Sequence, residues 1–381
     1  VSFTITEKGY LVTDTSNKNH LMAVLTDLLY RRYLTGRYPV AMVSMDNCSH
    51  NGDKLKNGIM AYAREWIKEE KCEKDFIEYL KSNVSFPWSM IDKITPRPDE
   101  IVKRMLEEDG FTDTDLIITD KNTYTAPFVN SEEIGYLVIE DDFPNGRIPL
   151  EKAGVLFTER ETVDKVEKMK VCTCLNPLHT ALAIFGCLLS YQTIHDEMED
   201  LQLKTLITKM CYEEAMPVVV KPGVIDPVEF AKTVLEVRLP NPFMPDSPWR
   251  IVTDTSQKLP IRFGETIKEY LKRKDLNVGD LTLIPLVIAG WCRYLMGIND
   301  EGEIFKPSDD PMLGELMPYF SNVKLGDKVN AHEILKPVLG NEVIFGVDLY
   351  IVGLADKVES MFLELIAEKN AIRKTLIKYL A

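Results

Sequence analysis

The sequence lacks the short motifs that identify several common enzyme classes. It has no GxGxxG or GxxxxGK[ST] loop, which would hold a phosphate, and no HExxH or GxSxG motif. It has no CxxC pair and only five histidines in 381 residues, so a structural metal site is not expected. The odd number of cysteines, seven, favours free thiols in a reducing cytoplasm. They are Cys48, Cys72, Cys172, Cys174, Cys187, Cys211 and Cys292.

Long apolar runs and basic tracts are also missing. The longest apolar stretches, Ala181–Leu189 and Leu283–Gly290, are too short to span a membrane. The first six residues do not have the pattern of a signal peptide. With 45 Lys and Arg against 59 Asp and Glu, the net charge of −14 repels nucleic acid. We therefore expect a cytoplasmic protein with neither nucleic acid nor membrane as a partner.

The first part of the chain alternates between strand and helix patterns. Strands are predicted over Ser2–Thr6 and Val40–Met45, and helices over His20–Tyr33 and Asp53–Glu70. This order is the βα repeat of a parallel sheet, in which the loops that leave the carboxyl ends of strands hold the ligand. The loop Ser44–Asp53 therefore lies where chemistry is expected.

The rest of the chain changes from β-rich to helical. Two prolines make Phe86–Pro96 a constrained extended segment, and residues 115–158 are β-rich, with a turn at Asp142–Arg147. We therefore place a domain boundary near residue 160, between an α/β portion (1–160) and an all-α portion (161–381). Helices are predicted over Val163–Val171, His179–Met198, Gln202–Ala215, Pro227–Leu239, Phe263–Arg273, Leu281–Leu295 and Val347–Leu380.

One group of polar residues precedes the predicted helix that starts at His179. Lys170, Asn176 and His179 fall within ten residues of one another. A lysine in a dry pocket can exchange protons near neutral pH, and an asparagine amide can stabilise an alkoxide. Pro177 disfavours helical geometry at Asn176, so we expect that residue in a loop. On spacing alone, a helix cap and a core histidine are the better-supported interpretation.

Two further segments are candidates for ligand binding. Asp46–Asp53 is a polar, turn-forming loop after a buried strand, and a plain solvated turn is equally compatible with it. Arg250, Lys258 and Arg262 lie on a polar stretch that we expect to be extended. The three cations can hold an anionic or polyhydroxylated ligand, although a surface loop paired with the protein's own carboxylates is favoured when the stretch is taken alone.

Taken together, these segments resemble the polyol-specific long-chain dehydrogenases, the family of mannitol 2-dehydrogenase and D-mannonate oxidoreductase (fructuronate reductase). The resemblance runs in order over nearly the whole chain. The matching stretches are Ser2–Tyr10 (SFTITEKGY), Ser44–Asp53 (SMDNCSHNGD), Ser85–Pro96 (SFPWSMIDKITP), Glu140–Arg147 (EDDFPNGR), Lys170–Leu182 and Arg250–Arg262 (RIVTDTSQKLPIR).

The resemblance implies a Rossmann-type nicotinamide-binding domain followed by a mostly helical substrate domain. Because the chain opens on Val1 in what resembles the middle of the nucleotide domain, we expect the sequence to be part of a longer product. The cofactor implied is NAD, with NADP left open, and no metal is implied. The implied partner is a small sugar or sugar acid, and the expected assembly is a monomer or small oligomer.

The resemblance also implies roles for individual residues. Lys170 would be the general acid/base, and Glu167 would relay its proton to solvent. Asn47 and Asn176 would form the oxyanion hole, and His179 would bind the substrate near the reacting carbon. The implied substrate contacts are Arg250, Lys258 and Arg262, and the implied cofactor contacts are Asp92, Thr6 and Glu7.

Two departures from the family pattern bear on these roles. Five residues, Val171–Leu175, separate Lys170 from Asn176, where the family usually has four. Either a bulge absorbs the extra residue or the register is shifted, in which case Lys168 is the alternative base. Trp88 stands where many relatives have asparagine, which would reshape the pocket near the cofactor.

The substrate is the remaining choice. The implied reaction transfers a hydride to or from C2 of a six-carbon chain that ends in a hydroxymethyl group or a carboxylate. Arg262 is an additional cation, and an uncompensated cation favours a carboxylate, so we expect D-mannonate and D-fructuronate. The alternatives are D-mannitol and D-fructose, or a non-catalytic sugar-acid-binding protein if the chain truly begins near Val1.

Overall fold

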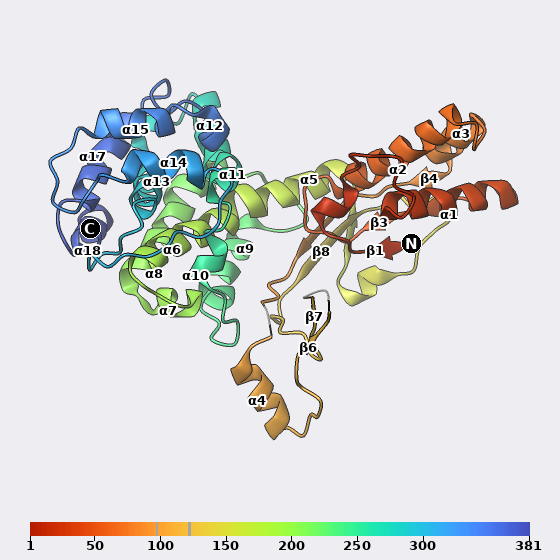
Figure 1. Ribbon diagram of the computed structural model, residues 1–381, viewed down its shortest axis with the longest axis horizontal. Coiled ribbons are helices and arrows are strands. Elements are labelled where there is room, and N and C mark those ends of the chain that lie inside the picture. The colour runs from red at the N-terminus through yellow and green to blue at the C-terminus, as the bar shows by residue number, and fades with distance from the viewer. Residues whose placement is uncertain (97, 121–122) are drawn as a thin grey trace. The chain divides into compact units, whose positions relative to one another are not determined.

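The protein was analysed as a computed structural model that describes residues 1–96, 98–120 and 123–381 (Figure 1). The chain divides into two compact units. The α/β unit comprises Val1–Ile94, Glu133–Glu167 and Pro222–Ile225, and the helical unit comprises Thr95–Glu132, Lys168–Lys221 and Asp226–Ala381.

The α/β unit is built on short parallel strands, as the sequence pattern predicts. β1 (Ser2–Phe3) pairs in parallel with β3 (Val43–Ser44), and β2 (Val40–Ala41) pairs in parallel with β4 (Val84–Ser85). Residues 40–44 therefore lie between the other two segments, and their carboxyl ends face the same edge. The helices of this unit are α1 (Leu21–Gly36), α2 (Asn51–Lys68) and α3 (Asp75–Ser82), preceded by the 3₁₀ turn η1 (Glu7–Tyr10).

A three-stranded sheet follows in the same unit. β5 (Ser89–Asp92) is antiparallel to β8 (Tyr136–Glu140), which is parallel to β9 (Leu156–Thr158). The predicted extended segment is thus confirmed over the residues that are described. The predicted turn is also present, because the Gly146 N–H donates to the Phe143 carbonyl at 2.9 Å and Gly146 has a φ of 74°. The 3₁₀ turn η2 (Leu150–Ala153) precedes β9.

Apolar side chains of α1, α2 and α3 form the main core of the α/β unit. Met22, Leu55, Ile59, Phe76 and Leu80 have no exposed surface. Burial of a side chain of this size contributes about 1.5–3 kcal/mol, so these contacts fix the helices on the strands. The loops at the carboxyl edge are thereby built on a rigid base.

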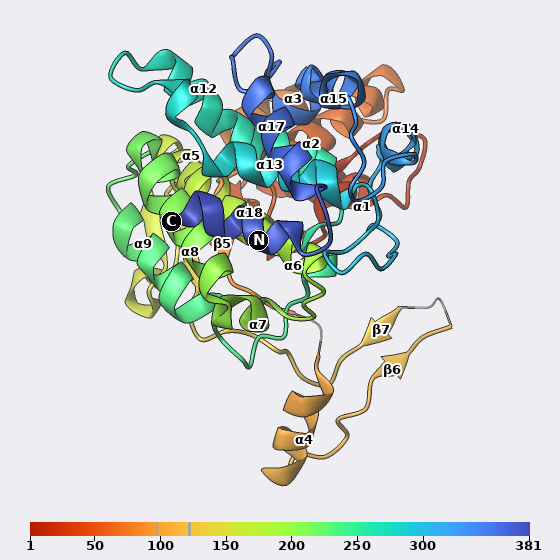
Figure 2. The ribbon, with the colours of Figure 1, turned by 90° about the vertical axis from the view of Figure 1, so that its left-hand side faces the viewer.

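The helical unit is organised around two buried helices, α6 (Asn176–Leu188) and α13 (Leu283–Tyr294). Every residue of α13 is buried, and α13 packs against both α6 and α17 (Figure 2). The other helices are α4 (Glu100–Glu108), α5 (Arg160–Met169, which ends in this unit), α7 (Ile194–Glu199), α8 (Leu201–Lys209), α9 (Pro227–Thr233), α10 (Pro248–Ile251), α11 (Thr255–Leu259), α12 (Glu265–Lys272), α14 (Leu313–Phe320), α15 (Ala331–Leu339), α16 (Glu342–Phe345), α17 (Ala355–Leu365) and α18 (Ala371–Leu380). The described part of the unit also contains the short 3₁₀ turns η5 (Met216–Val218) and η8 (Val278–Asp280).

Four stretches of the helical unit are wound as π turns, with i to i+5 hydrogen bonds. They are η3 (Lys170–Cys174), η4 (Met210–Ala215), η6 (Val234–Arg238) and η7 (Pro260–Gly264). A π turn holds one residue more than an α turn and is frequent at functional sites. Each of the four carries a charged side chain that is largely withdrawn from solvent: Lys170, Glu214, Arg238 and Arg262.

Some predicted helices are wrong in their extent. The helix predicted over His179–Met198 is two helices, because Ser190 adopts a φ of 65° after α6 and ends it. Of the helix predicted over Val347–Leu380, residues 347–354 are not helical, and the rest is divided into α17 and α18, with Asn370 at a φ of 61° just before α18. Positive φ at a residue other than glycine leaves no clear trace in a sequence.

Two expectations about polar segments are also wrong. Asn176 is the first residue of α6, not part of a loop, and Pro177 behind it occupies the first turn, where its missing N–H costs nothing. The stretch Arg250–Arg262 is not extended either. It is formed by α10, α11 and η7, and Pro248 begins α10 in the same way.

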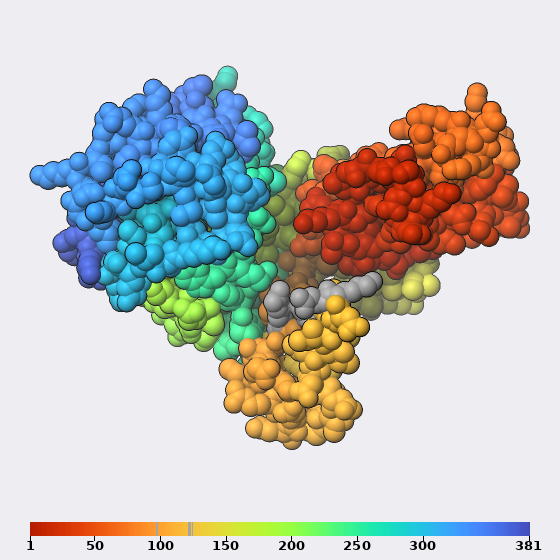
Figure 3. Space-filling model, in the orientation of Figure 1, coloured from red at the N-terminus to blue at the C-terminus, as the bar shows by residue number. Residues whose placement is uncertain are grey.

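The described residues of 95–132 form an arm of the helical unit, with α4 followed by the antiparallel strands β6 (Ile117–Ile118) and β7 (Tyr124–Thr125) (Figures 2 and 3). No residue of α4 is buried. The end of the arm is attached by a buried ion pair, in which Arg238 Nε and Nη2 donate to the Glu132 carboxylate at 3.0 and 2.8 Å. Large exposed apolar side chains of the arm are Ile101, Met105, Phe111, Leu116, Ile117 and Ile118.

One helical stretch, Arg160–Leu188, is long and apolar enough to cross a membrane by length and composition. Its most apolar window is 78% buried inside the protein, and core helices of soluble proteins pass the same test. This is weak support for a membrane span. All seven cysteines are without a disulfide partner, as the sequence predicts.

Candidate active site

Asp46 fixes the loop that leaves β1. Its carboxylate, which is buried at the end of β3, accepts hydrogen bonds from the backbone N–H groups of Ile5 at 2.9 Å and Thr6 at 2.7 Å. The Tyr10 hydroxyl also donates to it. Thr6 is thereby held at a φ of 67°, an unusual conformation for a β-branched residue. Thr6 and Glu7, the predicted cofactor contacts, are both exposed at this edge.

A second network joins the loops after β3 and β4. The Asn51 amide donates to the carbonyls of Asp46 and Ser89 at 2.9 and 3.0 Å, and it accepts from the Ser89 N–H at 3.0 Å. A Cβ at Gly52 would lie 2.4 Å from the Phe86 carbonyl, so only glycine allows the start of α2 to approach this closely. Asn47, the predicted oxyanion donor, lies exposed between these braced segments.

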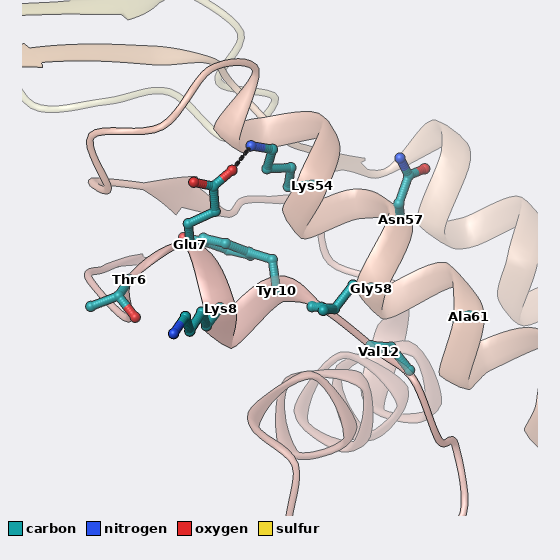
Figure 4. A pocket seen from close by; sticks show the side chains of 10 residues that line it. Thr6, Glu7, Lys8, Tyr10, Val12, Lys54, Asn57, Gly58 and Ala61 are labelled. Atoms are coloured by element: carbon teal, nitrogen blue, oxygen red, sulfur yellow. Dashed lines mark hydrogen bonds and ion pairs between the residues drawn. The ribbon is translucent and has the colours of Figure 1, made fainter. Parts of the chain in front are cut away.

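A cavity of about 770 Å³ opens beside the loop after β1 (Figure 4). The Lys54 ammonium donates to the Glu7 carboxylate at its rim, as the dashed line in Figure 4 shows. Thr6, Glu7, Lys8, Tyr10, Leu11, Val12, Lys54, Asn57, Gly58 and Ala61 line the cavity. A fixed carboxyl edge with an adjoining cavity is what a Rossmann domain offers to a nucleotide, so the residues present fit such a cofactor.

The remaining site residues of the α/β unit lie on α5 and β5. The Ser49 hydroxyl donates to the Glu167 carboxylate in the last turn of α5. Asp92 is buried at the end of β5. The Trp88 indole stacks on the His50 ring with a centroid distance of 4.1 Å, and its N–H is buried without a partner among the described residues.

In the helical unit, Lys170 begins the π turn η3 and is only 2% exposed. The Leu175 N–H donates to the Lys170 carbonyl at 3.1 Å, which is the i to i+5 bond that defines the turn. This turn absorbs one extra residue between Lys170 and Asn176, which favours the bulge over a shifted register. The turn lies against α6 and η7, the elements that carry His179 and Arg262.

His179 lies in the first turns of α6, largely buried. Its Nε2 has no hydrogen-bond partner within the described part of the chain and lies 3.6 Å from Asp246 Oδ2. Burial lowers the pKa of His179 to about 4; the Asp246 carboxylate raises it, and three arginines, Arg262 foremost, lower it further. The imidazole is therefore neutral at physiological pH and can either donate to or accept from a hydroxyl.

Arg250 and Lys258 differ in how their charges are balanced. Arg250 Nε donates to Asp246 Oδ1 at 2.7 Å, and its Nη2 donates to the other oxygen. Lys258 instead donates to backbone carbonyls, those of Ile251 at 3.1 Å and Thr253. Burial, together with the two nearby arginines, lowers the pKa of Lys258 to about 8.

Arg262, on η7, is a partly buried cation without a carboxylate partner in the described ranges. Its guanidinium donates to the hydroxyl of Thr180, the residue after His179. Burial lowers its pKa to about 10, which leaves it charged at neutral pH. The site thus carries more positive charge than its own carboxylates balance.

The structure brings six predicted residues together in one unit: Lys170, Asn176, His179, Arg250, Lys258 and Arg262. The other five belong to the α/β unit: Asn47, Glu167, Asp92, Thr6 and Glu7. Sequence reasoning missed Asp246, which contacts two of the first group. Its position four residues before Arg250, on a helix start between two prolines, is the only signal that the sequence offers.

Comparisons with known proteins identify the class. A family model described as the mannitol dehydrogenase Rossmann domain matches residues 1–152, and one described as the mannitol dehydrogenase C-terminal domain matches residues 162–365. The chain belongs to this family, and it is an oxidoreductase with a Rossmann-type domain and a helical C-terminal domain, as the resemblance implies.

Several individual relatives are similar over most of the chain. D-mannonate oxidoreductase of Thermotoga maritima is 52% identical over 98% of this chain and 73% of its own length. A mannitol 2-dehydrogenase of Phaeosphaeria nodorum is 30% identical over 100% of this chain, which spans 64% of that relative. Among solved structures, Pseudomonas fluorescens mannitol 2-dehydrogenase in a ternary complex with NAD and D-mannitol matches with a TM-score of 0.72, at 25% identity over 100% of this chain and 74% of that one.

Proposed function

We propose that this chain catalyses the interconversion of D-mannonate and D-fructuronate with NAD as cofactor, in the cytoplasm. The similarity to a D-mannonate oxidoreductase at 52% identity supports this assignment. The observation that carries the choice of a sugar acid is the partly buried Arg262, which has no ion-pair partner in the described ranges and lies beside His179. A substrate carboxylate would compensate that charge.

The site residues divide the work of the proposed reaction. When bound, the nicotinamide nucleotide supplies or accepts the hydride at C2. In reduction, Lys170 Nζ donates its proton to the oxygen of the former carbonyl, and Glu167 returns a proton to the lysine. The amides of Asn47 and Asn176 donate to the developing negative charge on that oxygen. The neutral His179 and the cation Arg250 hold hydroxyl groups of the substrate.

The charge balance separates two substrate classes. Arg250 is already neutralised by Asp246, and a ketose such as D-fructose would leave Arg262 buried without a counterion. A buried unpaired charge is costly, so binding a carboxylate recovers free energy that binding a hydroxymethyl group does not. Mannitol 2-dehydrogenases are among the relatives, so D-mannitol and D-fructose form the second candidate pair.

The test measures NADH and NADPH oxidation by the full-length protein with D-fructuronate and D-fructose, for the wild type and for Arg262→Gln. We expect a preference for fructuronate, and a rise in its KM of about 100-fold in Arg262→Gln, because a charge-assisted pair contributes about 3 kcal/mol. Activity with fructose would change little. Arg273→Gln, which alters an exposed arginine paired with Asp275, is the matched control. Equal losses on both substrates would assign Arg262 a structural role instead.

A further inference from the structure

Asp246 is a buried carboxylate that joins three parts of the helical unit. Its two oxygens accept from the Arg250 guanidinium, and Oδ1 also accepts from the Ser247 N–H at 2.9 Å. Its backbone carbonyl accepts from the Ile194 N–H at 2.9 Å, at the start of α7. Asp246 is 4% exposed, so the carboxylate itself is held rigidly from several directions.

The same carboxylate faces the ring of His179. The 3.6 Å between Asp246 Oδ2 and His179 Nε2 is beyond an ordinary hydrogen bond, but close enough for a strong electrostatic effect in a dry site. Of the charged groups that act on His179, Arg262, Arg250 and Arg238 disfavour a proton on the ring and Asp246 favours one. A neutral imidazole beside this carboxylate is therefore expected to carry its single proton on Nε2.

We propose that Asp246 is a positioning residue of the active site, which holds the Arg250 guanidinium in place and selects the tautomer of His179 with the proton on Nε2. Arg250 is more than half exposed, so without the carboxylate its long side chain would sample many rotamers. Two N–H groups of the Arg250 guanidinium donate to Asp246, so its other N–H groups can donate to a substrate hydroxyl. His179 and Arg250 then recognise adjacent parts of one sugar chain through a shared anchor.

A purely local role is the competing explanation, because Asp246 also supports the start of α10 through Ser247. Asparagine separates the two roles. Its side-chain oxygen can still accept from the Ser247 N–H, whereas it lacks the charge that binds the guanidinium and acts on the imidazole. The Asp246→Asn variant should therefore fold like the wild type and differ from it only in the site.

The kinetic test uses the full-length protein and the keto-sugar that it reduces best, so it rests on the proposed function only for the reaction class. We expect Asp246→Asn to raise KM about tenfold or more with a smaller change in kcat, since the cost falls on substrate positioning. Asp246→Glu, which keeps the charge, should recover part of the loss. In a double-mutant cycle, Arg250→Ala should add little to the effect of Asp246→Asn, because either substitution alone already breaks the same ion pair.

A matched control alters an equivalent ion pair away from the site. Asp27→Asn removes the partner of Arg31, which also stands four residues later and bonds through Nε at 2.7 Å. This variant should keep the wild-type KM. A KM for Asp246→Asn that equals that of Asp27→Asn, or effects of Asp246→Asn and Arg250→Ala that simply add, would overturn the proposal.

A second measurement does not depend on activity or cofactor. Long-range ¹H–¹⁵N correlation spectra report which ring nitrogen of a neutral histidine carries the proton, and His179→Asn identifies the signal among the five histidines. We expect the Nε2–H form in the wild type and a mixture of tautomers in Asp246→Asn. An unchanged tautomer would overturn the positioning of His179 even if the enzyme uses a substrate other than fructuronate.

Discussion

Glu197 offers a direct test of the electrostatics of the helical unit. The residue lies on α7 with no exposed surface, and neither carboxyl oxygen has a hydrogen-bond partner in the described part of the chain. It packs so closely on α6 that a Cβ at Gly186 would lie 1.6 Å from its Oε1. Burial, reinforced by the carboxylates of Asp196, Asp246 and Asp200, raises the pKa of Glu197 well above its ordinary value of 4.5.

The direction of the pH dependence follows from this shift. Glu197 is protonated in the folded protein over a pH range in which the unfolded chain has already released that proton. Its stabilising contribution is therefore complete below pH 4.5 and declines as the pH rises toward the folded-state pKa. The decline is about 1.4 kcal/mol for each pH unit between 4.5 and the folded-state pKa. For a unit of this size, each pH unit within that range lowers Tm by roughly 3–6 °C.

The assay compares Tm of the helical unit at pH 5.5 and 7.5 for the wild type, Glu197→Gln and Glu199→Gln. Glutamine cannot ionise, so Tm of Glu197→Gln should fall much less between pH 5.5 and 7.5 than Tm of the wild type. Glu199 is an exposed neighbour on the same helix, and its variant should keep the wild-type decrease. If Tm falls by the same amount in Glu197→Gln and in the wild type, then Glu197 is ionised in the folded state and the argument from burial fails.

Two further predictions concern catalysis. Lys170→Ala should lower kcat by about 10²–10⁴-fold because the proton donor is lost. The Kd for the cofactor, measured by fluorescence titration, should stay close to that of the wild type. A variant with near-full turnover would place the base elsewhere, and Lys168 would be tested next. The pKa of Lys258 is lowered to about 8, so KM for a sugar acid should rise above pH 8 as the ammonium loses its proton. In Lys258→Arg, KM should stay constant to pH 9.5 because arginine remains charged. Parallel pH profiles for the two proteins would contradict a role for the Lys258 charge in binding.

The sequence predicts the α/β unit well because its signals are local. The short apolar run Val40–Met45 and the helical spacing in His20–Tyr33 depend only on near neighbours, and both segments form the predicted elements. The helical unit is predicted less well where a single backbone angle decides. Ser190 follows the end of α6 and Asn370 precedes the start of α18, both with positive φ values that their residue types do not require.

The candidate site is likewise predictable from the sequence only in part. The family resemblance supplies the residues, and six of them do lie in one unit, but it contains nothing about which charges are paired. Asp246 neutralises Arg250, whereas Arg262 bonds only to a hydroxyl. The fold of the chain between α7 and α10 places the Asp246 carboxylate at the site. Charge pairing is a property of three-dimensional neighbours, and the spacing of four residues between Asp246 and Arg250 is the one trace of it in the sequence.

The π turn at Lys170 also has a consequence for how this enzyme diverges from its relatives. A helix can accept a single inserted residue as a local bulge, which leaves the turns on either side in their old places and changes only the segment that bears the bulge. Such a site lets evolution adjust the reach of the Lys170 side chain in small steps without rebuilding the core around α6. Removal of one residue from Val171–Cys174 would convert the π turn to an α turn, and the activity of the resulting protein would show whether the π turn sets the position of Lys170.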